Sequence, residues 1–373
     1  MKWSLYIGKL SGIKIFIHWT FLLLIGWISF MNYSMSKDIK QVLISVLFIL
    51  SVFACIILHE IGHALVAQYF HYKTKDITLL PIGGMARMDE LPEKPKEELL
   101  VSIAGPVINL LIAAIIYPLM HWFSDVPSLF TTMFVTGENF LFTLYIVNIG
   151  LALFNLLPAF PMDGGRIFRA GLSFFMDRLT ATNVAVKTGQ VMATLFFIVG
   201  IFYNPILTVI SIFIFLFAQT ENDAVRAKYI LSNYAVRDIM SKDVNSLSPN
   251  DTISDAMKSV LEKNADHFLI LENNTVIGTI NKKQILKALN TGGVDSTVRS
   301  YMNDKVRFLS SDTPMDKIYS EQYFSENAIF PVIENDLLVG IINVSMMDEF
   351  IVLKSAKKKL PGLFTKKINS VKT

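Results

Sequence analysis

The sequence has little charge and almost no cysteine. Of its 373 residues, 17% are charged and 52% are hydrophobic, whereas an average soluble domain carries about 25% charged residues. This balance argues against an ordinary soluble enzyme. The single cysteine, Cys55, excludes an intramolecular disulfide and any cysteine-rich metal site. A metal bound by this protein must therefore use His, Asp or Glu ligands.

Acidic residues are scarce in the first part of the chain. Residues 1–233 contain 14 Asp and Glu, and residues 234–353 contain 17, against 11 Lys and Arg. Seven lysines follow the last acidic residue, Glu349. A nucleic-acid-binding domain needs a basic face. The acidic second part therefore predicts no nucleic-acid partner.

Long uncharged runs dominate the first part. A bilayer core needs about 20 mostly apolar residues per helix, and runs at 15–33, 42–58, 101–120 and 140–158 meet or approach that length. A fifth run, 188–220, can hold two short helices with a turn at Tyr203, Asn204 and Pro205. We predict an α-helical polytopic membrane domain of six spans at 1–222, a connector at 223–233, an α/β module at 234–353 and a basic tail at 354–373.

Basic residues between the runs are distributed unequally. With the N-terminus in the cytoplasm, 14 Lys and Arg lie on the cytoplasmic side of the spans, and Lys37 and Lys40 lie outside. This asymmetry follows the positive-inside rule. It predicts a multi-pass protein of the cell membrane with both termini in the cytoplasm.

An H-E-x-x-H motif, His59 to His63, ends the second run. On a helix, residues i and i+4 share a face, so both imidazoles can bind one Zn²⁺ while Glu60 approaches the metal-bound water. Ionisable residues at membrane depth are costly and usually functional. This favours a metal site over the alternative, polar helix-end residues that reach the interface.

A catalytic zinc usually has three protein ligands and a water. Asp163 follows the fourth run, which crosses in the same direction as the second, so the topology predicts similar depths for Asp163 and the two histidines. Asp163 is thus the candidate third ligand. The alternative is an ordinary polar loop that ends a helix.

Together these motifs resemble the site-2 proteases, a family of intramembrane zinc metalloproteases. The family pairs H-E-x-x-H with N-x-x-P and a following L-D-G-like motif, which Asn155, Pro158 and Asp163 match, although Met162 replaces the usual Leu. The pairs Gly83–Gly84 and Gly105–Pro106, the latter followed by Asn109, are similar to further elements of the family.

The resemblance implies that His59, His63 and Asp163 bind zinc and that Glu60 is the general base. Asn109 and Asn155 are then donors or substrate-orienting groups, or equally well interhelical hydrogen-bonding residues. The resemblance also implies short strands near Gly83 and Gly84, whose edge could hold an unwound substrate segment by β-augmentation. A plain amphipathic loop is the alternative for that segment.

Two further polar residues carry less weight. His18 could touch the site, but beside Trp19 an interfacial anchor is the favoured interpretation. Cys55 lies one turn before His59, and a small buried residue is favoured over a competing metal ligand.

A repeat with a spacing of 62 residues begins after residue 233. Val236 matches Val298, Phe268 matches Phe330, and Gly278 matches Gly340. The first copy predicts helix, strand, strand and helix at 254–264, 268–272, 276–281 and 283–289. The pattern resembles a tandem pair of cystathionine-β-synthase (CBS) domains, at 234–291 and 296–353, which often binds adenosine nucleotides and could self-associate.

The nucleotide-binding form of the CBS family has Ser or Thr followed three positions later by Asp. Here these positions hold Asn281 and Gln284 in the first copy and Asn343 and Met346 in the second. A nucleotide ligand is therefore doubtful.

We expect a zinc endopeptidase that cleaves membrane-spanning proteins near the cytoplasmic face under control of the CBS pair. The alternative is a CBS-regulated cation channel or transporter with a path lined by His and Asp. Glu60 favours the protease, because hydrolysis requires a base and a cation path does not.

Overall fold

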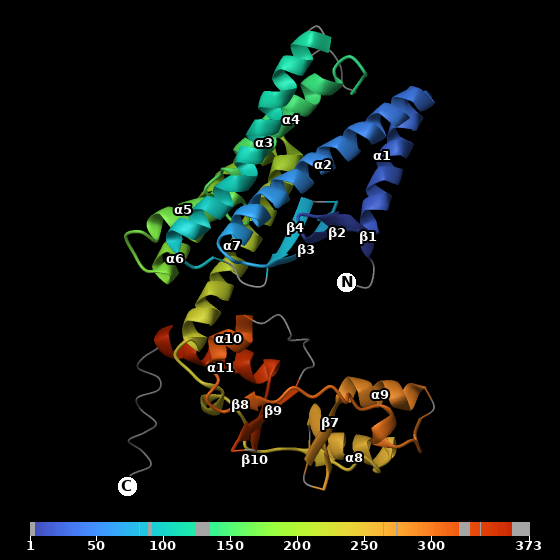
Figure 1. Cartoon of the computed structure of the whole chain (residues 1–373), viewed down its shortest axis with the longest axis vertical. Helices are drawn as coiled ribbons and strands as arrows, with labels where there is room; N and C mark the ends of the chain where they lie inside the picture. Colours follow the sequence, from blue (N-terminus) through green and yellow to red (C-terminus); the bar gives the residue numbers. More distant parts are fainter. Residues whose placement is uncertain are drawn as a thin grey trace. The chain divides into compact units, whose positions relative to one another are not determined.

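A computed structural model describes residues 4–81, 83–88, 92–123, 135–263, 265–273, 275–291, 293–320, 329–335 and 337–359 (Figure 1). The chain separates into two compact units, Met1–Val225 and Arg226–Thr373. The first unit consists of helices and one four-stranded sheet, and the second contains two three-stranded sheets with helices.

The helices of the first unit follow the apolar runs of the sequence. They are α1 (Thr20–Ser36), α2 (Ile39–Tyr69), α3 (Pro95–Phe123), α4 (Phe140–Asn155), α5 (Asp163–Leu172), α6 (Arg178–Tyr203) and α7 (Pro205–Leu231). Among the described residues, α2, α3, α6 and α7 are long and apolar enough to cross a membrane. The apolar helices α1 and α4 have 17 and 16 residues, so the structure supports four of the six predicted spans by this criterion.

Three helix ends in the first unit are capped or separated by polar residues. The Asp38 side chain accepts a hydrogen bond from the Lys40 amide at the start of α2, and Asp177 does the same for Thr180 at the start of α6. Asn204 separates α6 from α7 and accepts from the Ile206 amide. Short polar side chains at these positions satisfy amides that the helix leaves free. The turn predicted at residues 203–205 is confirmed.

The sheet of the first unit corrects the prediction for the first apolar run. Its strands, in the order β1-β2-β3-β4, are β1 (Ser4–Leu10), β2 (Ile13–His18), β3 (Thr74–Leu80) and β4 (Gly83–Met88). Residues 15–18, predicted as the start of a membrane helix, belong to β2, which pairs in parallel with β3. Ile13, Ile15 and Ile17 alternate with Lys14 and Phe16, and this period of two fits a strand rather than a helix.

The second unit contains the two predicted copies. The first has β5 (Ser246–Leu247), α8 (Ile253–Lys263), β6 (His267–Glu272), β7 (Thr275–Asn281) and α9 (Lys282–Asn290). The second has β8 (Leu309–Ser310), α10 (Met315–Ser320), β9 (Ile329–Glu334), β10 (Leu337–Asn343) and α11 (Val344–Lys359). The four elements predicted for the first copy are confirmed. The basic segment begins inside α11, and residues 360–373 of the predicted tail lie outside the described residues.

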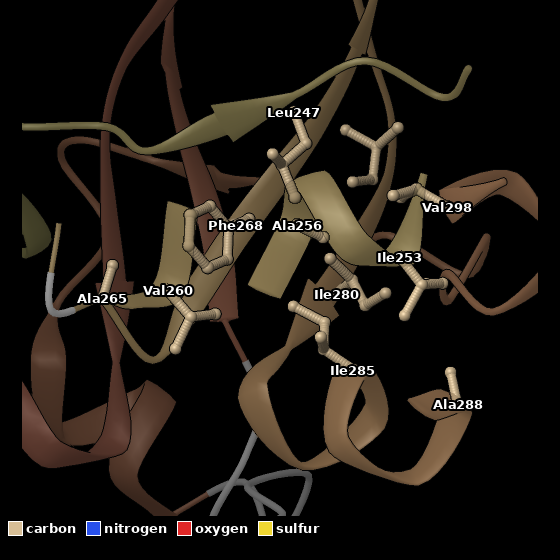
Figure 2. Close-up of a cluster of buried hydrophobic side chains, with 11 residues drawn as sticks. Leu247, Ile253, Ala256, Val260, Ala265, Phe268, Ile280, Ile285, Ala288 and Val298 are labelled. Carbon is tan, nitrogen blue, oxygen red and sulfur yellow. The ribbon is translucent and has the colours of Figure 1, made fainter. Parts of the chain in front are cut away.

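The two copies exchange their leading segments. The short helix η2 (Val298–Ser300) precedes the second copy in sequence, yet Val298 is fully buried in the core of the first copy with Phe268 and Ile280 (Figure 2). The short helix η1 (Val236–Asp238) likewise places Val236 in the core of the second copy with Val332. Because each core requires a segment from the other half, the copies form one structural unit.

The burial of His267 predicts that the stability of this unit depends on pH. It is the only histidine after residue 225, and burial lowers its pKa below 6.5, although Asp266 acts in the opposite direction. Below pH 6.5 the unfolded chain binds more protons at this site than the folded chain, so stability decreases as the pH falls. A fragment of residues 226–359 should melt at a lower temperature at pH 5.5 than at pH 7.5. His267→Gln should lessen that difference, and an unchanged difference would contradict the assignment.

Candidate metal centre

Helix α2 places the H-E-x-x-H histidines on one face. His59 and His63 are only 6% and 7% exposed, and their rings meet edge to face with centroids 4.7 Å apart. The helix continues past the motif to Tyr69. The limits of the uncharged run had predicted that the motif ends the helix. The structure corrects this prediction, because the motif lies in the body of α2. An internal position fixes the backbone on both sides of each imidazole.

Asp163 meets the two histidines from the start of α5. Its Oδ2 atom lies 3.1 Å from Nε2 of His59 and 3.1 Å from Nε2 of His63, and the two Nε2 atoms are also 3.1 Å apart. The structure thus brings together three ligand atoms from segments 100 residues apart in sequence. Sequence reasoning predicted the same three residues.

This triangle fits a zinc ion. Zinc binds nitrogen and oxygen ligands at about 2.0–2.2 Å in a tetrahedral arrangement, which places neighbouring ligand atoms about 3.3 Å apart. Nδ1 of His63 lies 2.7 Å from the Val101 carbonyl, which can accept its proton, so that Nε2 carries the lone pair. Nδ1 of His59 is buried and has no hydrogen-bond partner among the described residues. The donor set therefore suits a cation.

Two glycines allow the centre to be this compact. A Cβ atom on Gly105 of α3 would collide with Nε2 of both His63 and His59. Gly84 of β4 packs against Glu60 in the same way. A Cβ atom on Gly84 would lie 2.7 Å from Cγ and 3.2 Å from Oε1 of Glu60. Gly105 therefore lets α3 approach the ligands, and Gly84 gives Glu60 its space.

Gly83 and Gly84 thus have different roles at the start of β4. The backbone of Gly83 has a φ of +142°, which side-chain-bearing residues rarely adopt, whereas Gly84 contacts Glu60. Among the described strands β4 pairs with β3 only, so its other edge has no strand partner. The predicted strands near Gly83 and Gly84 are confirmed, and one of them contacts Glu60.

The loop between α4 and α5 presents Asp163. Gly164 and Gly165 pack directly on the backbone of that loop, since a Cβ atom on Gly165 would lie 2.8 Å from the carbonyl carbon of Ala159 and from the amide nitrogen of Phe160. The buried side chains of Ala159, Phe160 and Met162 anchor the loop. Asp163 therefore follows an apolar, closely packed turn.

The two asparagines named from the sequence have different surroundings. Asn109 lies one helical turn after Gly105 on α3, is 1% exposed, and has an Oδ1 atom without a hydrogen-bond partner among the described residues. Asn148 of α4 also has an Oδ1 atom without a partner among the described residues, so both interpretations of Asn109 stay predictions. Asn155 is the half-buried last residue of α4. Its role stays a prediction.

Cys55 and His18 each contact residues outside the candidate metal centre. Cys55 packs with Ile116 and Leu144, and its Sγ atom lies 3.5 Å from Nδ2 of Asn148. His18 ends β2 and forms a hydrogen bond of 2.8 Å with the Thr20 hydroxyl. Neither residue is in the group of possible metal ligands formed by His59, His63 and Asp163.

Comparison with known proteins gives the family. A sequence profile of peptidase family M50 matches residues 47–198, and a profile of the CBS domain matches residues 236–291. Zinc metalloprotease MJ0392 of Methanocaldococcus jannaschii is 34% identical over 348 residues, which are 92% of this chain and 94% of that protein. The chain belongs to peptidase family M50.

Two further relatives resemble this M50 protein. Putative zinc metalloprotease Rip3 of Mycobacterium tuberculosis is 26% identical over 257 residues, covering 65% of this chain and 64% of that protein. The solved site-2 protease from Methanocaldococcus jannaschii is 34% identical, with a TM-score of 0.45, and the match covers 59% of this chain and 95% of that one. By the M50 and CBS profiles and by its relative MJ0392, the M50 protein is a zinc metalloprotease of the site-2 protease type with a CBS domain pair, and a membrane protein.

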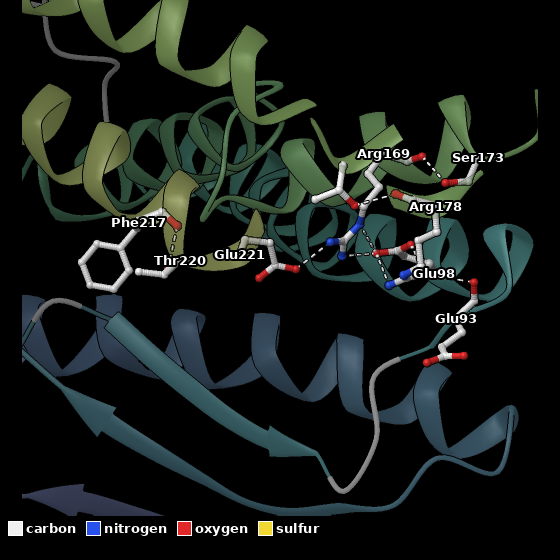
Figure 3. Close-up of polar contacts among 9 residues, drawn as sticks. Glu93, Glu98, Arg169, Ser173, Arg178, Phe217, Thr220 and Glu221 are labelled. Atoms are coloured by element: carbon white, nitrogen blue, oxygen red, sulfur yellow. Dashed lines mark hydrogen bonds and ion pairs between the residues drawn. The ribbon is translucent and has the colours of Figure 1, made fainter. Parts of the chain in front are cut away.

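Sequence reasoning missed three contributions to the centre of this M50 protease. No motif indicates that the Val101 carbonyl orients His63, because a backbone group has no residue signature. The collision that Gly105 avoids depends on the crossing of α2 and α3. A buried charge cluster around Arg169 also escaped notice, because its members are scattered over four helices (Figure 3).

The geometry predicts that Gly105→Ala disrupts the metal centre. The added methyl group displaces both imidazoles, so zinc affinity should fall by at least about tenfold, the usual effect of disturbing groups that orient metal ligands. Gly171→Ala on α5 is the matched control, since no atom lies within 4 Å of its Cβ position. Titration of the metal-free protein with zinc against a chelator measures both. Equal affinities in the two variants would contradict the proposed packing.

Proposed function

We propose that His59, His63 and Asp163 bind the zinc of this protease and that Glu60 is its general base. The substrate class is a membrane-spanning protein, cleaved near the cytoplasmic face. The observation that carries the proposal is the convergence of three ligand atoms at 3.1 Å with Glu60 beside them, against the edge strand β4. A metal-dependent peptidase combines a metal site and a base next to a place for the peptide.

A zinc ion held by these three residues would lower the pKa of a bound water to about 7 and would polarise the scissile carbonyl. The Glu60 carboxylate accepts the proton of the attacking water and later delivers it to the leaving amine. His63, whose ring is held by the Val101 carbonyl, keeps Nε2 directed at the centre. Asn109 is suited to hold the substrate through its amide, since its Oδ1 atom has no partner among the described residues.

The substrate must present an extended backbone. A helix inside a membrane pairs all its amides internally, so a peptide bond becomes accessible only when the helix unwinds locally. The edge of β4 offers backbone groups to such a segment by β-augmentation, and Gly84 places that edge against Glu60. This pairing would bring an extended peptide to the base and the metal together.

Six membrane spans and cytoplasmic termini complete the proposal. At 1.5 Å per residue, α1 and α4 extend about 26 and 24 Å, slightly less than the hydrocarbon core of about 30 Å. Short loops and the sheet could complete both crossings. The distribution of Lys and Arg supports cytoplasmic ends. The comparisons favour the protease over the alternative of a cation path.

Glu60→Gln should abolish cleavage while zinc stays bound. Gln keeps the volume of Glu and leaves the three ligands intact, but it cannot accept the proton. His59→Ala and Asp163→Ala should instead lose zinc, because each removes a ligand. Cleavage of a reconstituted single-span substrate and metal content measured on the same samples separate the two classes. Normal cleavage by the Glu60→Gln protein would rule out the assigned base.

We propose that the CBS pair controls the protease by pairing or by substrate access rather than by an adenosine nucleotide. Asn281 caps α9 by accepting from the Gln284 amide at 2.9 Å, and the Gln284 side chain accepts in return from the Asn281 amide. Asn343 caps α11 through the Met346 amide. The positions that would hold a ribose are therefore occupied by helix caps without a carboxylate.

Nucleotide binding should accordingly be weak. Calorimetry of residues 226–359 with AMP, ADP and ATP should show no binding at micromolar concentrations. The double variant Asn281→Thr with Gln284→Asp, which restores the family pattern in the first copy, serves as the matched control and should bind more tightly. A micromolar dissociation constant for the natural sequence would contradict the prediction.

A further inference from the structure

A buried ion-pair cluster links four helices of the membrane unit. The Arg169 guanidinium on α5 contacts Glu98 of α3, with Nε 2.9 Å from Oε1, and Glu221 of α7 at 2.7 Å (Figure 3). Arg178 of α6 binds the other oxygen of Glu98 at 3.0 Å. The side chains of Arg169 and Glu98 are 1% and 4% exposed. Two cations and two carboxylates make the cluster neutral.

Arg169 is attached to the segment that carries Asp163. It lies on the same ten-residue helix, α5, of which Asp163 is the first residue. Its guanidinium also lies over the Phe160 ring, with Cζ 5.0 Å from the centroid. Phe160 belongs to the loop that leads into Asp163. Arg169 therefore holds both the helix after the ligand and the loop before it.

The partner of Arg169 belongs to the helix that orients the histidines. Glu98, Val101 and Gly105 follow one another at helical spacing on α3, so they lie on one face. Val101 holds His63, and Gly105 admits both rings. The Glu98–Arg169 pair thus fixes α5 to the same face of α3 that fixes the two other ligands.

We infer that Arg169 is a positioning residue for the metal centre, which holds Asp163 in register with His59 and His63 through Glu98. A metal–ligand distance tolerates only about 0.2 Å, whereas a shift of α5 by one residue along its axis is about 1.5 Å. The planar fork of arginine satisfies two carboxylates in fixed directions, which the point charge of lysine does not. Arg169 provides the directional contact that an apolar helix surface lacks.

Glu221 extends this dependence to α7. The helix continues without a break from Glu221 to Leu231, beyond the boundary of the first unit. A displacement of α7 would therefore act on Arg169 and through it on Asp163. The inference rests on the proposed zinc ligands, and it gives the proposed CBS control a route to one of them along the continuous helix α7 and across the Glu221–Arg169 ion pair.

Zinc affinity of the full-length protein in detergent tests the inference. Arg169→Lys keeps the charge and loses the fork, and it should raise the zinc dissociation constant about tenfold or more. The matched control is Arg178→Lys, the same change at the other arginine that binds Glu98. The hydrogen bonds of Arg178 within the described residues go to Glu93 and Glu98, so this variant should keep the natural affinity. Chelator competition on metal-free protein gives both constants.

A second measurement separates positioning from stability. Co²⁺ in place of zinc reports its ligand set through its visible absorption, which should change in Arg169→Lys and not in Arg178→Lys. If Arg169→Lys does not fold, Glu221→Gln, which keeps the shape and weakens one contact of Arg169, should still raise the dissociation constant. The inference is overturned if a folded Arg169→Lys protein binds zinc with the natural affinity. If Arg169→Lys does not fold, natural affinity in Glu221→Gln overturns it instead. An equal loss of zinc affinity in Arg178→Lys also overturns it.

These outcomes are independent of proteolysis. A natural protein that binds zinc and cleaves no substrate would remove the proposed function and leave the role of Arg169 intact. A natural protein that cleaves, beside an Arg169→Lys variant that binds zinc normally, would remove the role of Arg169 alone.

Discussion

Helix α3 approaches the two histidines so closely that no side chain larger than hydrogen fits at Gly105. The rest of the centre depends on this approach. It brings the Val101 carbonyl to Nδ1 of His63 and places Asn109 one turn further along the same face. It also sets where Glu98 stands, and hence where Arg169 and α5 can be held. One helix contact therefore determines the geometry of proposed ligands that come from two other helices.

The candidate residues of the site could be named from the sequence, because they are residue types with few other uses in a membrane. His59, Glu60, His63 and Asp163 are ionisable groups beside apolar runs, and burial there requires a function. The structure brings the three proposed ligands together as expected. Glu60 could be named as the base but not placed, since its contact with Gly84 depends on a sheet built from two distant segments.

The fold was less predictable in segments where nearly every residue is apolar, because the alternation that distinguishes a strand from a helix is then hard to see. Uncharged residues at 15–33 were expected to form a helix, yet residues 15–18 lie in β2, because pairing with β1 and β3 selects the alternation of Ile15 and Ile17. The elements of the first CBS copy could be predicted from the repeat, in which Gly278 and Gly340 recur at equal strand positions. The exchange of Val236 and Val298 between the copies was not visible, because a repeat reveals similar segments and not which partner each one contacts.

Helices in a membrane gain little from hydrophobic contact with one another, because lipid tails are equally apolar. This protein uses two other means to fix its helices. Glycines set the separations: Gly62 faces Ala104 and Ile108, Gly189 faces Ala159, and Gly200 faces Thr208. Small residues of this kind allow close contact but permit sliding along the helix axis. The contacts of Arg169 with Glu98 and Glu221 resist sliding, because their hydrogen bonds are directional and a buried charge without a partner is costly. Close packing thus brings the three proposed metal ligands near one another, and in the role inferred for Arg169 its ion pairs hold Asp163 at the axial position where the three side chains meet.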